Sequence, residues 1–184
     1  MKDTEFIRGK VPMTKEEVRT LVLSKLKLNA RDILMDIGAG TGSVSIEAAQ
    51  ILTQGKVIAI EHKPQAVALI QQNAEHFGVT NIELLHCKAP AGMENLSQVD
   101  KYFIGGSGGN LSAILSLIDK NIRKNGIVVV TAIVVDTMIE AYQFFKSHQY
   151  CFELIQVMIN RVDFDKPAAM LMAQNPVFIL SAKR

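Results

Sequence analysis

The chain has few cysteines, little net charge and no long apolar run, and each shortage excludes a class of protein. Its two cysteines, Cys87 and Cys151, lack the C-x-x-C spacing of zinc sites, so we expect no disulfide framework, no metal site and a reducing, cytoplasmic compartment. A net charge of +2, from 20 basic and 18 acidic side chains, argues against a nucleic-acid partner. The apolar runs at 127–130 and 132–135 are too short to cross a bilayer, so no membrane association is expected.

The composition and the apolar pattern favour one α/β domain over residues 1–184. Apolar residues make up 48% of the chain, which is enough for the core of a single domain. The first helix is predicted to begin between Thr14 and Glu17, a T-x-x-E capping box followed by apolar residues at helical spacing. Residues 1–30 therefore form an N-terminal segment and helix ahead of the first predicted strand.

Strand and helix patterns alternate after this helix. They predict strands at 33–37, 56–61, 82–86, 102–104 and 127–131, and helices at 43–54, 64–78, 110–124 and 136–148. This alternation is typical of a doubly wound, Rossmann-like α/β sheet with helices on both faces. The strand-like segments 152–159 and 177–181 have no helix pattern between them, so we expect them to pair antiparallel, joined by the long connection 160–175.

A glycine loop follows the strand predicted at 33–37. Gly38, Gly40 and Gly42 form a G-x-G-x-G pattern at the start of a helix. Glycines allow positive φ angles and close approach of a ligand to the main chain, and the helix directs N–H groups toward the same space. Glu61 ends the next strand, where an acidic side chain accepts hydrogen bonds from the ribose hydroxyls. This order of strand, loop, helix, strand and acid indicates a nucleoside-binding site.

Two residues indicate the type of nucleoside. The pyrophosphate fingerprint G-x-G-x-x-G needs glycine at position 43, where this chain has Ser43. Asp36 precedes the loop, where a carboxylate attracts an ammonium group rather than a pyrophosphate. A nucleoside that carries an amino acid therefore fits better than a dinucleotide, and an NAD-dependent oxidoreductase is the alternative of another class.

At these residues the sequence resembles the class I S-adenosylmethionine methyltransferases. Within them it is similar to the family of decarboxylating cobalt-precorrin methyltransferases of cobalamin biosynthesis, which act at carbon-15. The similar stretches cover nearly the whole chain and lie at 9–19, 36–47, 103–109 and 175–177. The glycine loop is shared by the superfamily, whereas Pro-Met-Thr-Lys-Glu-Glu at 12–17 and Gly-Gly-Ser-Gly-Gly at 105–109 are narrower signals.

The resemblance implies a seven-stranded, mostly parallel sheet with an antiparallel last strand, and S-adenosylmethionine as the cofactor. The methionine part of the cofactor would lie against Gly38, Ala39, Gly40, Thr41 and Gly42. Glu61 would hold the ribose, the backbone of Ala89 would meet the adenine, and Thr14 would close over the cofactor. Lys88 stands where many relatives have an acidic residue, so the resemblance carries over the backbone contact at Ala89 alone.

The implied substrate is a cobalt-precorrin, a tetrapyrrole with many carboxylates, and its methylation is coupled to decarboxylation of an acetate side chain. A wall without large side chains, able to bind anions through its N–H groups, is predicted at Gly105, Gly106, Ser107 and Gly108. Basic residues near the first helix and in the late connection are candidate partners for the carboxylates: Arg8, Lys10, Lys15, Arg19, Arg161 and Lys166.

The resemblance also implies a homo-oligomer, a tetramer. The sequence leaves open whether a separate protein performs the companion methylation at carbon-5, although this chain is too short to contain both domains. No catalytic side chain is predicted, because methyl transfer from a sulfonium needs alignment and exclusion of water more than acid–base groups. An RNA methyltransferase or another small-molecule methyltransferase of the same fold is the alternative. The small net charge and the absence of an Asn-Pro-Pro-Tyr motif after the fourth predicted strand count against RNA.

Overall fold

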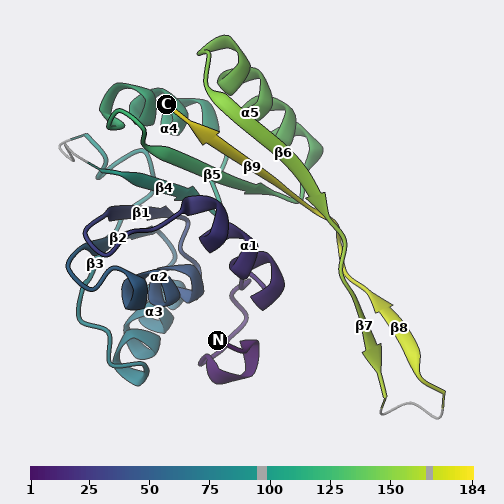
Figure 1. Ribbon diagram of the computed structural model, residues 1–184. Helices are drawn as coiled ribbons and strands as arrows, with labels where there is room; N and C mark the ends of the chain where they lie inside the picture. The colour runs from purple at the N-terminus through teal and green to yellow at the C-terminus, as the bar shows by residue number, and fades with distance from the viewer. Residues whose placement is uncertain (95–98, 165–167) are drawn as a thin grey trace.

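A seven-stranded sheet forms the centre of the protein (Figure 1). The computed structural model describes residues 1–94, 99–164 and 168–184. The strand order across the sheet is β3-β2-β1-β4-β5-β9-β6. Its strands are β1 (Ile33–Ile37), β2 (Lys56–Glu61), β3 (Ile82–His86), β4 (Lys101–Ile104), β5 (Ile127–Ala132), β6 (Cys151–Val157) and β9 (Val177–Lys183). After a short 3-10 helix (Asp3–Glu5), the helices are α1 (Glu16–Leu26), α2 (Ser43–Ile51), α3 (Pro64–His76), α4 (Leu111–Asn121) and α5 (Val135–Ser147).

The directions of the strands confirm the predicted sheet. Strands β1 to β5 are parallel to one another, and β9 runs antiparallel to both β5 and β6. The central strands are buried along most of their length, because helices cover both faces, and such strands read as continuous apolar runs. Strands β1, β2 and β3 have the predicted bounds, whereas the other predicted strands differ from the prediction by up to two residues at an end.

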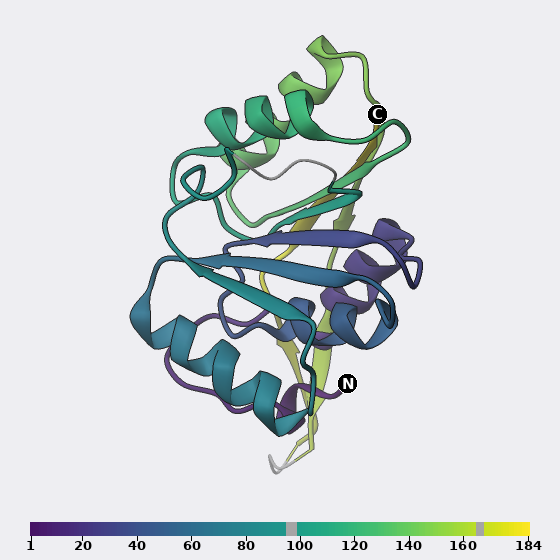
Figure 2. The same cartoon turned by 90° about the vertical axis from the view of Figure 1, so that its left-hand side faces the viewer.

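Two apolar cores lie on opposite faces of the sheet. Helices α4 and α5 cover one face, and α1, α2 and α3 lie on the other (Figure 2). The alternation of side chains along a strand assigns neighbours to opposite cores. Met35 and Tyr102 belong to the core beneath α4 and α5, whereas Leu34 and Phe103 pack with α1 and α2. None of the helices in the described part of the chain has the length and apolarity that crossing a membrane requires.

The predicted capping box at Thr14 is wrong. Helix α1 begins at Glu16, its N-cap residue is Lys15, and no side chain caps it. The Thr14 carbonyl oxygen instead accepts a hydrogen bond from Arg19 Nη1 at 2.6 Å, and Glu17 Oε1 accepts one from Arg161 Nη2 at 2.6 Å. The Glu17 carboxylate, which a capping box would have needed, thus bonds a tertiary partner instead.

The connection between β6 and β9 is an antiparallel arm that the sequence pattern did not predict. Strands β7 (Asn160–Asp163) and β8 (Met170–Ala173) pair with each other in a second sheet and extend away from the main sheet (Figure 1). Both strands have four residues, too few for a clear alternation of apolar and polar residues. Phe164 is 79% exposed and Leu171 is 71% exposed, so the arm presents apolar side chains to solvent.

Candidate functional site

A pocket of about 560 Å³ lies at the carboxyl ends of β1, β2, β4 and β5. The strand order reverses at β1, whose neighbours in the sheet are β2 on one side and β4 on the other. Ligands of open α/β sheets bind at such a switch point. The volume of the pocket also lies within the range of small-molecule sites. Its position and its volume therefore both predict that the ligand binds here.

The glycine loop forms the floor of the pocket with bare main chain. Gly38 has φ +73°, and a Cβ there would lie 2.4 Å from the carbonyl oxygen of Gly106. Gly40 has φ +60°, and a Cβ there would lie 3.1 Å from the carbonyl oxygen of Pro12. Both positions therefore require glycine for their backbone conformation and for the close approach of neighbouring chain segments.

The Glu61 carboxylate is fixed beside this loop at the end of β2. It is buried, and its Oε2 accepts a hydrogen bond from the Gly40 N–H at 3.0 Å. Its Oε1 accepts bonds from the N–H groups of His62 and Lys63, at 2.8 and 2.9 Å. These backbone donors hold the carboxylate in one orientation at the pocket, where its remaining lone pairs can accept hydrogen bonds from a ligand's hydroxyls.

A fully buried arginine holds the N-terminal segment, residues 1–15, against the pocket. Residues 11–15 line the pocket, and Arg19 Nη1 donates to the Thr14 carbonyl oxygen. The same guanidinium bonds Asp3 Oδ1 at 3.1 Å and Glu47 Oε1 at 2.6 Å. Arg19 is therefore not available to a substrate carboxylate, which corrects its prediction as a substrate contact.

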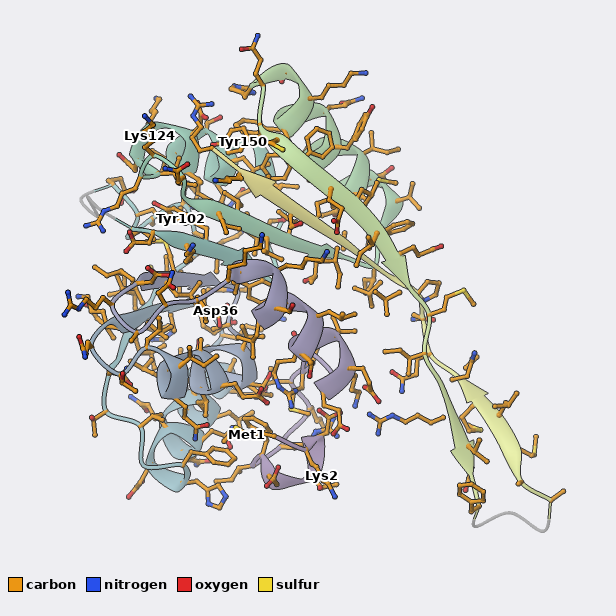
Figure 3. All side chains as sticks on the ribbon, in the orientation of Figure 1. Met1, Lys2, Asp36, Tyr102, Lys124 and Tyr150 are labelled. Carbon is orange, nitrogen blue, oxygen red and sulfur yellow. The ribbon has the colours of Figure 1, made fainter. Side chains whose placement is uncertain are left out.

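The Asp36 side chain is not among the residues that line the pocket, and it lies on the α2 side of the sheet (Figure 3). Asp36 lies two residues after Leu34 on β1, so its side chain points to the same face of the sheet, toward α2. There Ser45 Oγ donates a hydrogen bond to Asp36 Oδ2 at 2.5 Å. Its Oδ1 has no hydrogen-bond partner among the described residues. Desolvation by complete burial, together with the nearby Glu61 carboxylate, raises the pKa of Asp36 to about 7. The prediction that Asp36 attracts an ammonium group of the ligand is corrected.

The raised pKa of Asp36 predicts a loss of stability with rising pH. Between about pH 4 and 7 the native state keeps a proton that the unfolded chain releases, so the free energy of unfolding falls as pH rises through this window. We expect Asp36→Asn to remove this part of the fall, about 2 kcal/mol between pH 5 and 8, in urea unfolding. Glu83→Gln, at an exposed acid, is the control and should keep the original profile. An unchanged profile in Asp36→Asn would contradict the assignment.

The loop after β4 forms a second wall of the pocket, residues 105–108, which we call the glycine wall. The N–H groups of Gly105 and Gly106 both donate to the Ile37 carbonyl oxygen, at 2.9 and 3.3 Å. Asn110 Nδ2 donates to the Ala89 carbonyl oxygen at 2.8 Å, which joins this wall to the turn after β3. A Cβ at Gly106 would meet no atom within 4 Å, so the wall leaves open space in front of it.

The structure brings most of the predicted site residues together in one pocket. Those that line it are Thr14, Gly38, Ala39, Gly40, Glu61, Ala89, Gly105, Gly106, Ser107 and Gly108. Thr41, Gly42, Arg8 and Lys10 are not among the lining residues. Gly42 is the N-cap of α2 and packs against Ile70, which shapes the loop from behind. Of the two basic residues in the late connection, Arg161 bonds Glu17, and Lys166 lies outside the described residues.

Two apolar residues and one lysine are among the pocket residues that sequence reasoning missed. Ile133 and Val134, between β5 and α5, line it and are 67% and 52% exposed; we call them the apolar wall. Lys88, after β3, also lines it. All three follow the carboxyl ends of strands, and this position in the sequence could have identified them as pocket residues. In the sequence, however, Ile133 and Val134 look like a continuation of the buried strand β5.

Together, the strand order and the glycine pocket define a class I S-adenosylmethionine methyltransferase. A solved S-adenosylmethionine-dependent O-methyltransferase from Thermotoga maritima shares the fold with a TM-score of 0.80 at 13% identity, over 96% of this chain and 67% of that one. A family model described as a precorrin methyltransferase domain matches residues 5–184. The chain therefore belongs to the precorrin methyltransferase family.

Two further relatives are similar to this chain over nearly its whole length. A probable cobalt-precorrin-6B C(15)-methyltransferase (decarboxylating) from Sulfolobus acidocaldarius is 37% identical over 99% of this chain and 96% of the relative. The crystal structure of a precorrin-6y C5,15-methyltransferase from Geobacter metallireducens superposes with a TM-score of 0.95 at 36% identity, over 100% of this chain and 96% of that one. The similarity covers the N-terminal segment and the arm as well as the sheet.

The cofactor of this class is S-adenosylmethionine, and the pocket fits it. Bare main chain at Gly38 and Gly40 leaves room for a ligand that a Cβ would obstruct. The buried carboxylate of Glu61 stands beside that main chain, where it can accept from ribose hydroxyls. The pocket extends beyond these residues to the glycine wall and the apolar wall, which leaves space for a second molecule beside the cofactor.

Proposed function

We propose that this protein transfers a methyl group from S-adenosylmethionine to carbon-15 of cobalt-precorrin-6B in cobalamin biosynthesis, and that the carboxylate of an acetate side chain is lost as carbon dioxide. The observation that carries the proposal is the match to the decarboxylating relative along the whole chain, at 37% identity. The pocket supports it, because a nucleoside-binding floor and two walls for an acceptor share one space.

In this proposal Gly38, Ala39 and Gly40 hold the methionine part of the cofactor. Glu61 accepts hydrogen bonds from the ribose hydroxyls, and the backbone of Ala89 contacts the adenine. Thr14 closes the cofactor side from the N-terminal segment, where the bond from Arg19 to its carbonyl oxygen fixes it. Thr41 and Gly42 shape the loop without contacting the cofactor, because neither lines the pocket.

When bound, S-adenosylmethionine supplies an electrophilic methyl group on a sulfonium. The protein has to align carbon-15 with that methyl group and exclude water, so proximity supplies much of the acceleration. The glycine wall and the apolar wall present no titratable side chain, which suits this task. The departing carbon dioxide leaves its electron pair in the conjugated ring of the substrate, which then takes up a proton.

Mass spectrometry tests this function directly. The protein is incubated with S-adenosylmethionine and cobalt-precorrin-6B, and the product should have gained one methyl group and lost one carbon dioxide. A gain of two methyl groups would contradict the proposal that this chain methylates carbon-15 alone. A methyl gain without loss of carbon dioxide would contradict the coupled decarboxylation.

We infer that the protein is a homotetramer and that the arm of β7 and β8 contributes to the contact between its copies. The exposed apolar side chains of the arm support a contact with a second copy, because large exposed apolar groups mark interaction surfaces. We expect Leu171→Glu to shift the mass toward the monomer in analytical ultracentrifugation. The matched control is Ile51→Glu, at an exposed apolar residue at the end of α2. A monomeric unsubstituted protein at micromolar concentration would contradict the inference.

A further inference from the structure

Lys88 is a cation of the pocket that the cofactor roles do not use. It follows β3, its side chain is exposed, and it lines the pocket together with Ala89. A Cβ at Gly108 would lie 3.1 Å from Lys88 Cε and 3.9 Å from Lys88 Nζ. The end of the lysine side chain therefore lies against the main chain of the glycine wall.

The Lys88 ammonium has no acidic partner among residues 1–94, 99–164 and 168–184. Lys15 and Lys63 also line the pocket, but they lie in other surroundings than Lys88. Lys15 Nζ lies 3.6 Å from Asp3 Oδ2. Lys63 is the N-cap residue of α3, and its N–H donates to Glu61, so it belongs to the ribose side. Lys88 thus brings an unpaired positive charge to the glycine wall.

The apolar wall adds the second requirement on the acceptor. Ile133 and Val134 expose apolar surface into the same pocket, where water is a poor partner for them. A flat molecule with apolar faces and carboxylates on its rim satisfies both features at once, since the faces cover the apolar wall and a rim carboxylate reaches the ammonium. A tetrapyrrole with acidic side chains has this chemistry.

We propose that Lys88 is a specificity-determining residue that binds one rim carboxylate of the acceptor and so orients the ring against the apolar wall. The inference rests on the proposed function and deepens it. The bound carboxylate is one that the substrate keeps, because an ion pair stabilises a carboxylate and would oppose its loss as carbon dioxide. Lys88 therefore holds a part of the substrate other than the acetate that loses its carboxylate.

Ligand titrations test this role without turnover. Lys88→Met, Lys88→Arg and the control Lys120→Met, at an exposed lysine of α4 outside the pocket lining, are titrated with cobyrinic acid, a corrin with free carboxylates, and with its methyl ester, in which the charges are removed. We expect Lys88→Met to weaken cobyrinic acid binding about tenfold, which corresponds to the loss of one partly exposed charge contact of about 1.4 kcal/mol. Lys88→Arg and Lys120→Met should bind it within about twofold of the original, on the same scale. The ester should bind all four proteins alike.

The binding of S-adenosylhomocysteine, measured by calorimetry, separates the alternatives. It should be unchanged in Lys88→Met, and in turnover KM for the precorrin should rise more than kcat falls. Loss of S-adenosylhomocysteine binding would overturn the inference, because Lys88 would then serve the cofactor. Equal cobyrinic acid binding by Lys88→Met would overturn it as well. Failure of the unsubstituted protein to bind cobyrinic acid or to convert the precorrin would overturn the proposed function, and the inference with it.

Discussion

Gly40→Val is expected to abolish binding of S-adenosylmethionine. The residue has φ +60°, which valine adopts only with strain, and a Cβ there would lie 3.1 Å from the Pro12 carbonyl oxygen and 3.9 Å from Val11 Cγ1. The branched side chain would push the N-terminal segment away and occupy the space against the main chain that the cofactor needs. It would also disturb the hydrogen bond from the Gly40 N–H to Glu61.

Calorimetry with S-adenosylhomocysteine measures the effect, with a second glycine as the control. Gly78 has φ +63°, and a Cβ there would meet no atom within 4 Å. It ends α3 and is not among the pocket-lining residues, so Gly78→Val carries a similar backbone strain without the obstruction. We expect Gly78→Val to lose stability and to keep the original affinity. Tight binding by Gly40→Val would show that the cofactor does not lie against the loop.

Arg19→Met is expected to lower the free energy of unfolding by about 3–5 kcal/mol, the usual cost of removing one partner from a buried ion pair. The substitution keeps much of the apolar volume but leaves the carboxylates of Asp3 and Glu47 without the guanidinium between them. It also removes the hydrogen bond to the Thr14 carbonyl oxygen. We therefore expect weaker cofactor binding in the fraction that stays folded.

Urea unfolding at pH 7 measures this loss, and an exposed ion pair gives the comparison. Lys56 and Glu83 are both about half exposed and lie 2.7 Å apart. Lys56→Met should cost no more than about 1 kcal/mol, as is usual for surface pairs. If Arg19→Met cost as little, the network around Arg19 would not be what holds the N-terminal segment.

The sequence patterns that repeat over many residues predicted the fold well. The alternation of helices and strands, the parallel sheet and the antiparallel final strand are all confirmed. Long periodic patterns are informative because each added residue tests the same face of the element. The arm of β7 and β8 escaped, because four-residue strands give too short a pattern and their exposed apolar residues oppose the usual rule for surface loops.

Single side chains were harder to place than elements. Arg19 and Asp36 were both predicted to contact a ligand. In the structure both are fully buried, and neither lines the pocket. For Asp36 the reason is the alternation along β1, which turns it toward Ser45 on α2. For Arg19 the reason is the packing of the N-terminal segment, which brings the acids of distant elements to one guanidinium.

The order of residues by itself determined the doubly wound sheet, the glycine loop and the acid at the end of β2, because these depend on local periodicity and on the few residues that tolerate a positive φ. The tertiary structure decided which groups face the pocket. Lys88 and Ile133 lie 45 positions apart in the chain and follow β3 and β5, which three other strands separate in the sheet, yet both line one pocket. Such a juxtaposition depends on strand order and loop packing, which couple residues far apart in the sequence.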